Sequence, residues 1–180
     1  AQFWPHKNHV NLLKALVILR EKNYLSIPLV LVGSDKGNLA YIKKCVDELG
    51  LEQFVRILGF IPRDDLIGLY QSSFALTFLS LFGPENIPPL EAFQCECPVI
   101  ASNVAGSKEQ LGDAALLVDG TKPDEIAQAI IRLIDSPDLR HELIVKGKER
   151  ASSFTGFDYV RNVFSTLDQF EKIRGDWPAL

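Results

Sequence analysis

Short apolar runs alternate with longer segments of helical periodicity along this chain of 180 residues. The run at residues 28–33 is continuously apolar and ends in glycine, which is typical of a parallel strand buried on both faces. Further runs predict strands at residues 54–58, 74–79, 98–101 and 115–118. Residues 1–4 are expected to form the end of a strand whose beginning lies outside the sequence.

Apolar residues recur at the spacing of one helical face in segments 8–22, 39–49, 123–135, 138–151 and 157–173. Pro88 and Pro89 mark another helix start, because proline is tolerated in the first turn. The alternation predicts an α/β fold, a Rossmann-like three-layer α/β/α sandwich with a mostly parallel sheet. We assign residues 1–153 to this domain. Residues 154–180 form an appended helix, expected to pack across the sheet's edge or against something outside this chain.

Composition narrows the classes of partner. The 19 basic and 23 acidic residues give a net charge of −4, which argues against nucleic acid binding through the phosphate backbone. The longest apolar runs are about six residues, far below the roughly 20 that span a bilayer. The chain opens without methionine or a signal-peptide pattern, so we interpret it as a fragment. An odd number of cysteines, 3, favours a reducing compartment, and we expect the cytoplasm.

Ligands of open α/β sheets bind at the carboxyl ends of the strands, so we considered the loops after residues 33, 58, 79 and 101. The loop at 80–87 contains glycine and proline and leads directly into a helix, whose free amides attract anions. Residues 64–107 include no Lys or Arg, so a phosphate there needs a cation from elsewhere. Lys7 is the candidate, with Lys108 or Arg63 assisting.

Two acids accompany this anion site. Glu85 and Glu91 would repel a phosphate and are better suited to accept hydrogen bonds from the hydroxyls of a ribose or sugar ring. The combination predicts a nucleotide-sugar ligand. The histidines near Lys7, His6 and His9, are expected to be solvated loop residues rather than metal ligands, and no metal site is predicted.

Several motifs occur along the chain in the same order as in a known protein family. They are Ile-Pro-Pro-Leu-Glu-Ala-Phe at 87–93, Cys-Pro-Val-Ile-Ala-Ser at 97–102, Ala-Gly-Ser-Lys-Glu at 105–109 and Gly-Asp-Ala-Ala at 112–115, preceded by matches at 5–8, 31–33, 55–62 and 69–72. This pattern resembles the donor-binding, C-terminal half of the group-1 (family 4-like) retaining glycosyltransferases, which have the two Rossmann-like domains of the GT-B architecture. The similarity covers nearly the whole chain.

The resemblance implies a role for each matching position. Glu91 would bind the ribose diol of the donor, and Lys7 would neutralise its diphosphate. Glu85 and Lys7 are the implied catalytic residues. The implied donor-binding residues are Glu91, Gly83, Pro84, Asn86, Ile87, Pro88, Leu90, Gly33, Phe60 and Ile61.

The chain also departs from the family pattern. The first of the family's paired glutamates lies eight positions before the second, where this chain has Gly83, whereas Glu85 lies six positions before it. Gln2 stands in place of the usual arginine ahead of the lysine, and Glu96 stands in place of a common glycine.

The resemblance implies transfer of a hexose-type sugar from a nucleoside-diphosphate sugar to an acceptor with retention, without a cofactor. An N-terminal Rossmann-like acceptor domain would complete the enzyme, and any peripheral membrane contact is expected only through that domain. The alternative is a degenerate, non-catalytic nucleotide-binding or scaffolding module of the same fold. Dinucleotide-binding and P-loop motifs are absent from the sequence.

Overall fold

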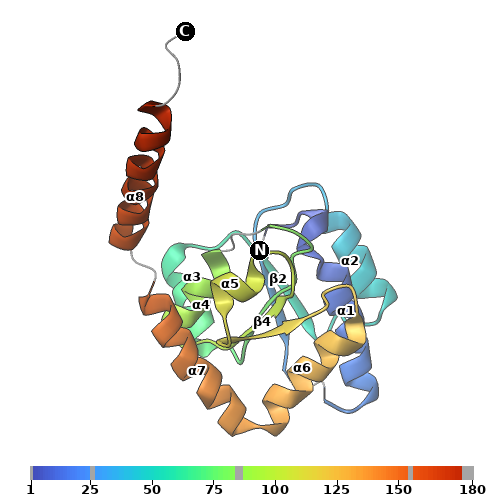
Figure 1. The fold of residues 1–180 in the computed structure, drawn as a ribbon. Coiled ribbons are helices and arrows are strands. Elements are labelled where there is room, and N and C mark those ends of the chain that lie inside the picture. Colours follow the sequence, from blue (N-terminus) through green and yellow to red (C-terminus); the bar gives the residue numbers. More distant parts are fainter. Residues whose placement is uncertain (1, 25–26, 84–86, 154–155, 176–180) are drawn as a thin grey trace.

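The computed structural model describes residues 2–24, 27–83, 87–153 and 156–175 (Figure 1). The strands are β1 (Leu29–Val32), β2 (Val55–Gly59), β3 (Leu76–Phe78), β4 (Val99–Ser102) and β5 (Ala115–Val118). The helices are α1 (His9–Glu21), α2 (Leu39–Glu48), α3 (Arg63–Ser72), α4 (Ile87–Gln94), α5 (Ser107–Leu111), α6 (Pro123–Asp135), α7 (Pro137–Ser152) and α8 (Gly156–Gly175), with a 3₁₀ turn, η1, at Pro5–Lys7.

The five predicted strands after residue 4 are all present, each within one or two residues of its predicted bounds. Helices α3 and α5 were not predicted from the sequence. Helix α5 has only 5 residues, so helical periodicity has little length in which to show, whereas α3 has 10 residues but fully buries only Tyr70 and so has a weak apolar face. Residues 1–4 do not form a strand among the described residues; Phe3 alone makes an isolated parallel bridge, to Asp35.

Every strand pairing is parallel, which confirms the α/β prediction. Strand β1 pairs with β2, and β3, β4 and β5 pair in that order. Successive residues of β4 face opposite sides of the sheet: Ile100 joins the core beneath α1 and α6, whereas Val99 and Ala101 join the core beneath α4. All four β4 residues are buried, so helices cover both faces and the fold has three layers.

Helix α4, which follows the loop of interest, is held by α7. Phe93 of α4 is fully buried, and Gly147 of α7 leaves room for its ring. The turn after α4 places Glu96 at a φ of +58°, the left-handed conformation that glycine adopts most easily. Glu96 is paired there with Lys148 of α7 at 2.6 Å. The position for which the family resemblance implied glycine is therefore left-handed in this chain.

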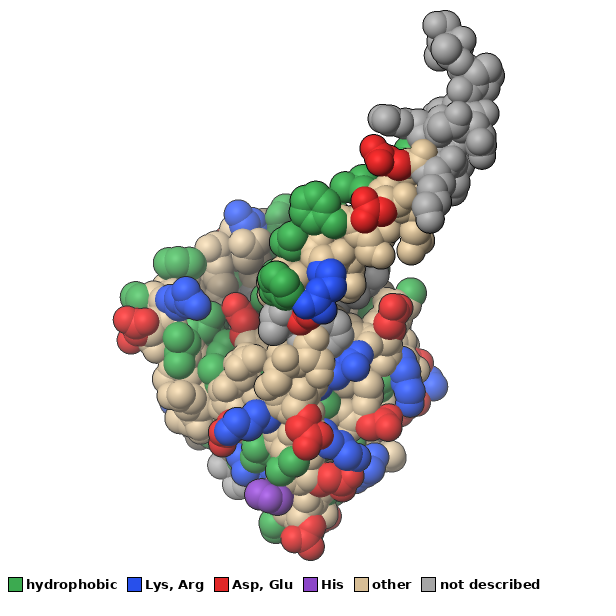
Figure 2. Space-filling model, turned by 60° about the vertical axis from the view of Figure 1, so that its left-hand side comes forward, with side chains coloured by type: hydrophobic (Ala, Val, Ile, Leu, Met, Phe, Trp, Pro, Cys, Tyr) green, Lys and Arg blue, Asp and Glu red, His purple; other side chains and the backbone are tan. Residues whose placement is uncertain are grey.

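Helix α8 projects away from the body of the domain (Figure 1). Its apolar side chains gather along the projecting helix in Figure 2 and are exposed, Phe157 by 70% and Phe164 by 62%. Of the two expectations for this helix, packing across the sheet's edge is therefore wrong, and packing against something outside this chain stays a prediction. Its apolar residues recur on one face, but periodicity does not specify which surface that face meets. No helix in the described part of the chain is long and apolar enough to cross a membrane.

Candidate functional site

The loops that follow the strands meet at one edge of the molecule. Gly33, after β1, donates its N–H to the carbonyl of Gly59 at the end of β2, at 2.8 Å. Leu81, after β3, donates its N–H to the carbonyl of His6, at 2.9 Å. Because parallel strands end at the same edge, residues from distant parts of the sequence converge there.

Lys7 ends the 3₁₀ turn η1 and points toward the loop after β3. Its Nζ lies 3.4 Å from the Ser80 hydroxyl and 5.0 Å from the centroid of the Phe78 ring. Partial burial lowers the pKa of the Lys7 ammonium, because the charged form loses hydration. None of the ion pairs within the described ranges involves Lys7. Lys7, the predicted phosphate-binding cation, therefore lies against the loop that follows β3.

The residue after Lys7 fixes this turn to the body. Asn8 is buried in the left-handed conformation, and its side-chain amide donates to the carbonyl of Gly120 at 2.6 Å. A Cβ at Gly120 would overlap the Ser102 hydroxyl, so glycine is required for this close approach. Lys7 consequently projects from a rigid turn rather than from a free loop.

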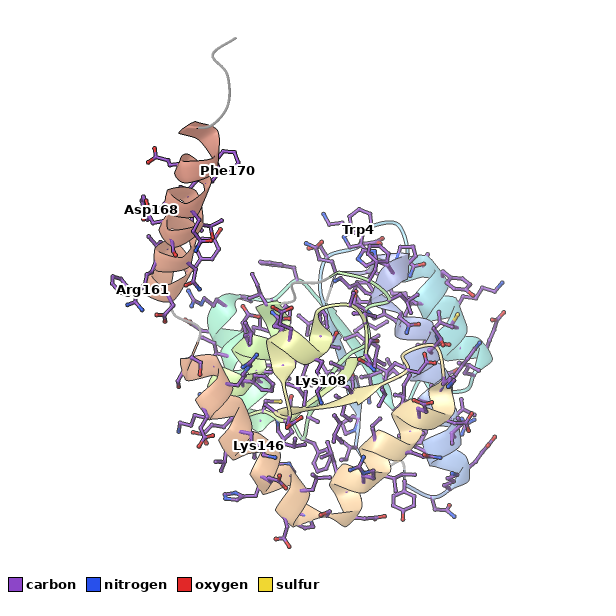
Figure 3. The ribbon with its side chains drawn as sticks, in the orientation of Figure 1. Trp4, Lys108, Lys146, Arg161, Asp168 and Phe170 are labelled. Atoms are coloured by element: carbon purple, nitrogen blue, oxygen red, sulfur yellow. The ribbon has the colours of Figure 1, made fainter. Side chains whose placement is uncertain are left out.

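Of the two histidines near Lys7, His9 differs from the prediction. His9 is buried and stacks on Phe3 with 5.0 Å between ring centroids, so it is not a solvated loop residue. Burial, reinforced by the nearby Lys7 charge, lowers the pKa of His9 to about 4. His6 stacks on Phe82 at 4.4 Å, and Trp4 stacks on His6 at 6.2 Å. Trp4 lies at the rim of the body in Figure 3.

This aromatic stack was missed from the sequence. Its members come from two loops more than 70 residues apart, and no local pattern links them. Gln2, in place of the expected arginine, accepts a hydrogen bond from the Trp4 indole at 3.0 Å. Gln2 therefore supports the stack of Trp4, His6 and Phe82 and adds no second cation to the site.

Helix α4 begins at Ile87, so Pro84, Glu85 and Asn86 lie outside the described residues, and nothing is reported of their geometry. Gly83 precedes them with a φ of +117°. In the first turn, Pro88 and Pro89 carry no N–H, so the amides available in it are those of Ile87 and Leu90. The prediction of a helix start at the prolines is confirmed, whereas the number of amides in that turn is smaller than in an ordinary helix.

Glu91 lies on the second turn of α4 with its side chain exposed. The Tyr70 hydroxyl of α3 donates to Glu91 Oε2 at 3.3 Å. Burial, together with the neighbouring Glu91 charge, raises the pKa of Tyr70, so the phenol stays protonated and keeps donating. The carboxylate is thus accessible, with one oxygen oriented by the protein. Tyr70 was identified only as part of a motif, because the contact spans 21 residues.

The remaining predicted positions lie along the same edge. Phe60 follows β2 and is 80% exposed, Ile61 is half-buried, and Gly33 is joined to Gly59 as described. The two assisting cations are less well placed. Lys108 on α5 is engaged with Asp113 at 3.3 Å, and Arg63 is exposed at the start of α3. No group of three or more potential metal ligands occurs in the part of the chain that the structure describes.

Comparison with known proteins gives the family. The model of the family described as "Glycosyl transferases group 1" matches residues 1–150. The O-antigen chain mannosyltransferase B of Escherichia coli is 30% identical over 151 residues, which are 84% of this chain and 40% of that protein. The chain therefore spans less than half the length of this relative.

Solved structures agree on the fold. HepE of Anabaena, in complex with UDP-glucose, superposes with a TM-score of 0.82 at 22% identity, over 94% of this chain and 47% of HepE. The C-terminal domain of the group 1 glycosyltransferase LpcC from Francisella tularensis gives a TM-score of 0.74 at 21% identity, over 84% of this chain and 81% of that domain. The chain belongs to the group 1 glycosyltransferase family, with the fold of a C-terminal GT-B domain.

Proposed function

We propose that this chain is the donor-binding domain of a retaining glycosyltransferase that transfers a hexose-type sugar from a nucleoside-diphosphate sugar to an acceptor. The observation that carries the proposal is the position of Lys7. It is a half-buried cation held on a rigid turn and directed at the loop between β3 and α4. Family membership and the mannosyltransferase relative support this class of donor.

Lys7 is proposed to bind the diphosphate. A partly desolvated ammonium gains more from an anion than an exposed lysine does, since less water competes for it. A hydrogen bond to a charged group contributes roughly 1.5–3 kcal/mol, which corresponds to about 10- to 150-fold in affinity. During transfer, negative charge grows on the departing nucleoside diphosphate, so the same lysine stabilises the transition state more than the ground state.

Glu91 is proposed to bind the ribose diol. Its exposed carboxylate is an acceptor of the kind that two vicinal hydroxyl donors require, and Tyr70 fixes one of its oxygens. Phe60 offers an exposed aromatic face for the base, with Ile61 beside it and Gly33 permitting close approach of the nucleotide. Leu90, Pro88 and Ile87 would contact the sugar and phosphates through the start of α4.

The rest of the reaction is assigned to the loop that precedes α4 and to a second domain. Glu85 is proposed to contact the donor sugar in place of the family's first glutamate, together with Pro84, Asn86 and Gly83 of the same loop. The acceptor and further catalytic groups would come from an N-terminal Rossmann-like domain that closes over this edge. The cytoplasm is the proposed compartment, consistent with three cysteines that are all free thiols.

Calorimetric titration tests the proposal. The protein is titrated with UDP-glucose, GDP-mannose, UDP and GDP, first unmodified and then as Lys7→Met and Glu91→Gln. We expect one of the nucleotides to bind and both variants to weaken it by at least 10-fold. Matched controls are Lys14→Met and Glu149→Gln, which remove exposed charges on α1 and α7 and should change affinity by less than 2-fold.

Two results would reject the donor-binding role. One is a folded protein that binds none of the four nucleotides at millimolar concentration, which would favour the non-catalytic scaffolding alternative. The other is nucleotide binding to which Lys7→Met and Glu91→Gln make no difference, which would place the ligand elsewhere.

A further inference from the structure

Two loops from distant parts of the sequence are joined around the side chain of His6. The backbone carbonyl of His6 accepts the N–H of Leu81 at 2.9 Å. The His6 ring stacks on the Phe82 ring, with 4.4 Å between the centroids and 30° between the planes. Lys7, the next residue, places its Nζ 3.4 Å from the Ser80 hydroxyl. The side chains of His6 and Lys7 therefore reach the same short segment of the loop that follows β3.

A further hydrogen bond holds this segment in shape. The Ser80 hydroxyl donates to the carbonyl of Phe82 at 2.8 Å, while its oxygen accepts from Lys7. Ser80 is buried, whereas His6 is half-buried and Phe82 is exposed. The His6 ring is thus held beside Lys7 by its contact with Phe82, and part of the ring stays open to solvent and to a ligand.

The candidate phosphate site carries little positive charge. The diphosphate of a nucleotide sugar has a negative charge on each phosphate, and Lys7 supplies one positive charge. Gln2 stands where the family resemblance implied an arginine, and Lys108 is engaged with Asp113 at 3.3 Å. A diphosphate bound to Lys7 would therefore leave net negative charge beside the turn that carries His6.

The surroundings of His6 contain few other charged groups in the ranges that the structure describes. Lys7 is its neighbour on the same turn, and Trp4, which also stacks on the ring, is neutral. On the loop packed against it, residues 79–83 have no titratable side chain. Glu85, farther along that loop, lies outside the described residues and is left unchanged in every variant used below.

These surroundings keep the ring neutral until an anion arrives. Partial burial, reinforced by the Lys7 charge, lowers the pKa of His6, so the imidazole is mainly neutral near pH 7. An anion bound at Lys7 acts in the opposite direction, because a nearby negative charge favours the protonated imidazole and raises its pKa.

We propose that His6 is a second diphosphate-binding residue, which takes up a proton when the nucleotide sugar binds and so adds a positive charge beside Lys7. The inference rests on the proposed function and extends it to the pH dependence of donor binding. The proton comes from solvent, is held on an imidazole nitrogen while the diphosphate is bound, and returns to solvent when the diphosphate leaves.

The direction of the pH effect follows from this linkage. Because the bound donor raises the pKa of His6, the donor binds more tightly where the ring can be protonated, so affinity increases as the pH falls. Above the pKa of the donor-bound state the ring is neutral with and without donor, and the gain is lost. Each unit by which the donor raises this pKa can add at most about 10-fold in affinity.

Calorimetric titration at about pH 8 and about pH 6 tests the proposal, with UDP-glucose and GDP-mannose as the probes. Nucleotide sugars are used because the terminal phosphate of free UDP or GDP itself gains a proton near about pH 6. We expect affinity for the nucleotide sugar that binds to rise about 3- to 10-fold from the higher to the lower pH. Titration in buffers of different ionisation enthalpy should show uptake of about half a proton for each donor bound near pH 6.5.

Three variants separate the charge of His6 from its packing. His6→Phe keeps a ring against Phe82 but cannot be protonated, so its affinity should change by less than about 2-fold between the two pH values. His6→Arg carries a permanent charge and should bind at about pH 8 at least about 3-fold more tightly than the unmodified protein. His141→Gln, which removes an exposed histidine of α7, is the matched control and should keep the full pH dependence. His9 stays neutral throughout, because its pKa is lowered to about 4.

The outcomes distinguish this inference from the proposed function. Lys7-dependent binding with the same pH dependence in His6→Phe as in the unmodified protein would overturn the role of His6 and leave the donor site in place. Proton uptake that persists in His6→Phe would assign the proton to another group, with the same consequence. If neither nucleotide sugar binds at either pH, the donor-binding function is rejected and this inference falls with it.

Discussion

Substitution of Gly147 by alanine would bring a methyl group against the ring of Phe93, the buried side chain of α4 that packs on α7. An ideal Cβ there lies 2.7 Å from Phe93 Cδ1, 3.2 Å from Cγ and 3.3 Å from Cε1. Phe93 is fully buried, so its ring has no free space to turn into. Since α4 carries Glu91, any shift of the ring is transmitted to the candidate donor site.

Two opposing effects determine how Gly147→Ala changes the free energy of unfolding. Overpacking a buried site costs about 1–3 kcal/mol, whereas alanine is favoured over glycine inside a helix by about 1 kcal/mol. Gly147→Ala should therefore lower the free energy of unfolding by up to about 2 kcal/mol. Gly68 of α3 provides the matched control, because a Cβ there meets nothing within 4 Å. Gly68→Ala should raise the free energy of unfolding by about 0.5–1 kcal/mol.

Urea denaturation of both variants, followed by circular dichroism, isolates the steric part. The difference between the two free-energy changes should be about 1–3 kcal/mol, because the helix propensity gain is common to both. Adding Phe93→Leu should relieve the cost of Gly147→Ala. The reasoning is refuted if Gly147→Ala stabilises the protein as much as Gly68→Ala does.

Three other changes test separate contacts. Tyr70→Phe removes the hydrogen bond to Glu91, so calorimetry should find nucleotide affinity weakened about 2- to 10-fold at an unchanged melting temperature; unchanged affinity would mean that Tyr70 does not orient the carboxylate. Glu96→Gly relieves a left-handed φ and loses one exposed ion pair, so urea denaturation should show a gain of about 0.5–1 kcal/mol; a loss would show that the ion pair outweighs the backbone cost. The pKa of His9 is lowered to about 4, so its contribution to stability is complete above about pH 6.5 and is lost as the pH falls toward 4. His9→Gln should flatten this pH dependence by on the order of 2–3 kcal/mol, whereas exposed His141→Gln should leave it in place.

The sequence alone determined the order and type of most elements. Apolar runs of strand length alternate with helical periodicity, and these are local properties of the chain. Pro88 and Pro89 fixed the start of α4 because their rings are compatible only with a first turn. Helix α5 was missed because 5 residues leave little periodicity to detect, and α3 was missed because it fully buries only Tyr70 and has a weak apolar face.

Only the tertiary structure decided which residues meet. Lys7 reaches Ser80 across 73 positions, and Tyr70 orients Glu91 from a different helix. His9 was expected to be a solvated loop residue, but it is buried because its ring stacks on Phe3. Strand register and helix packing place these side chains, and neither is encoded in a local pattern. Periodicity specifies that a face is apolar, whereas the fold decides what that face touches, as exposed α8 shows.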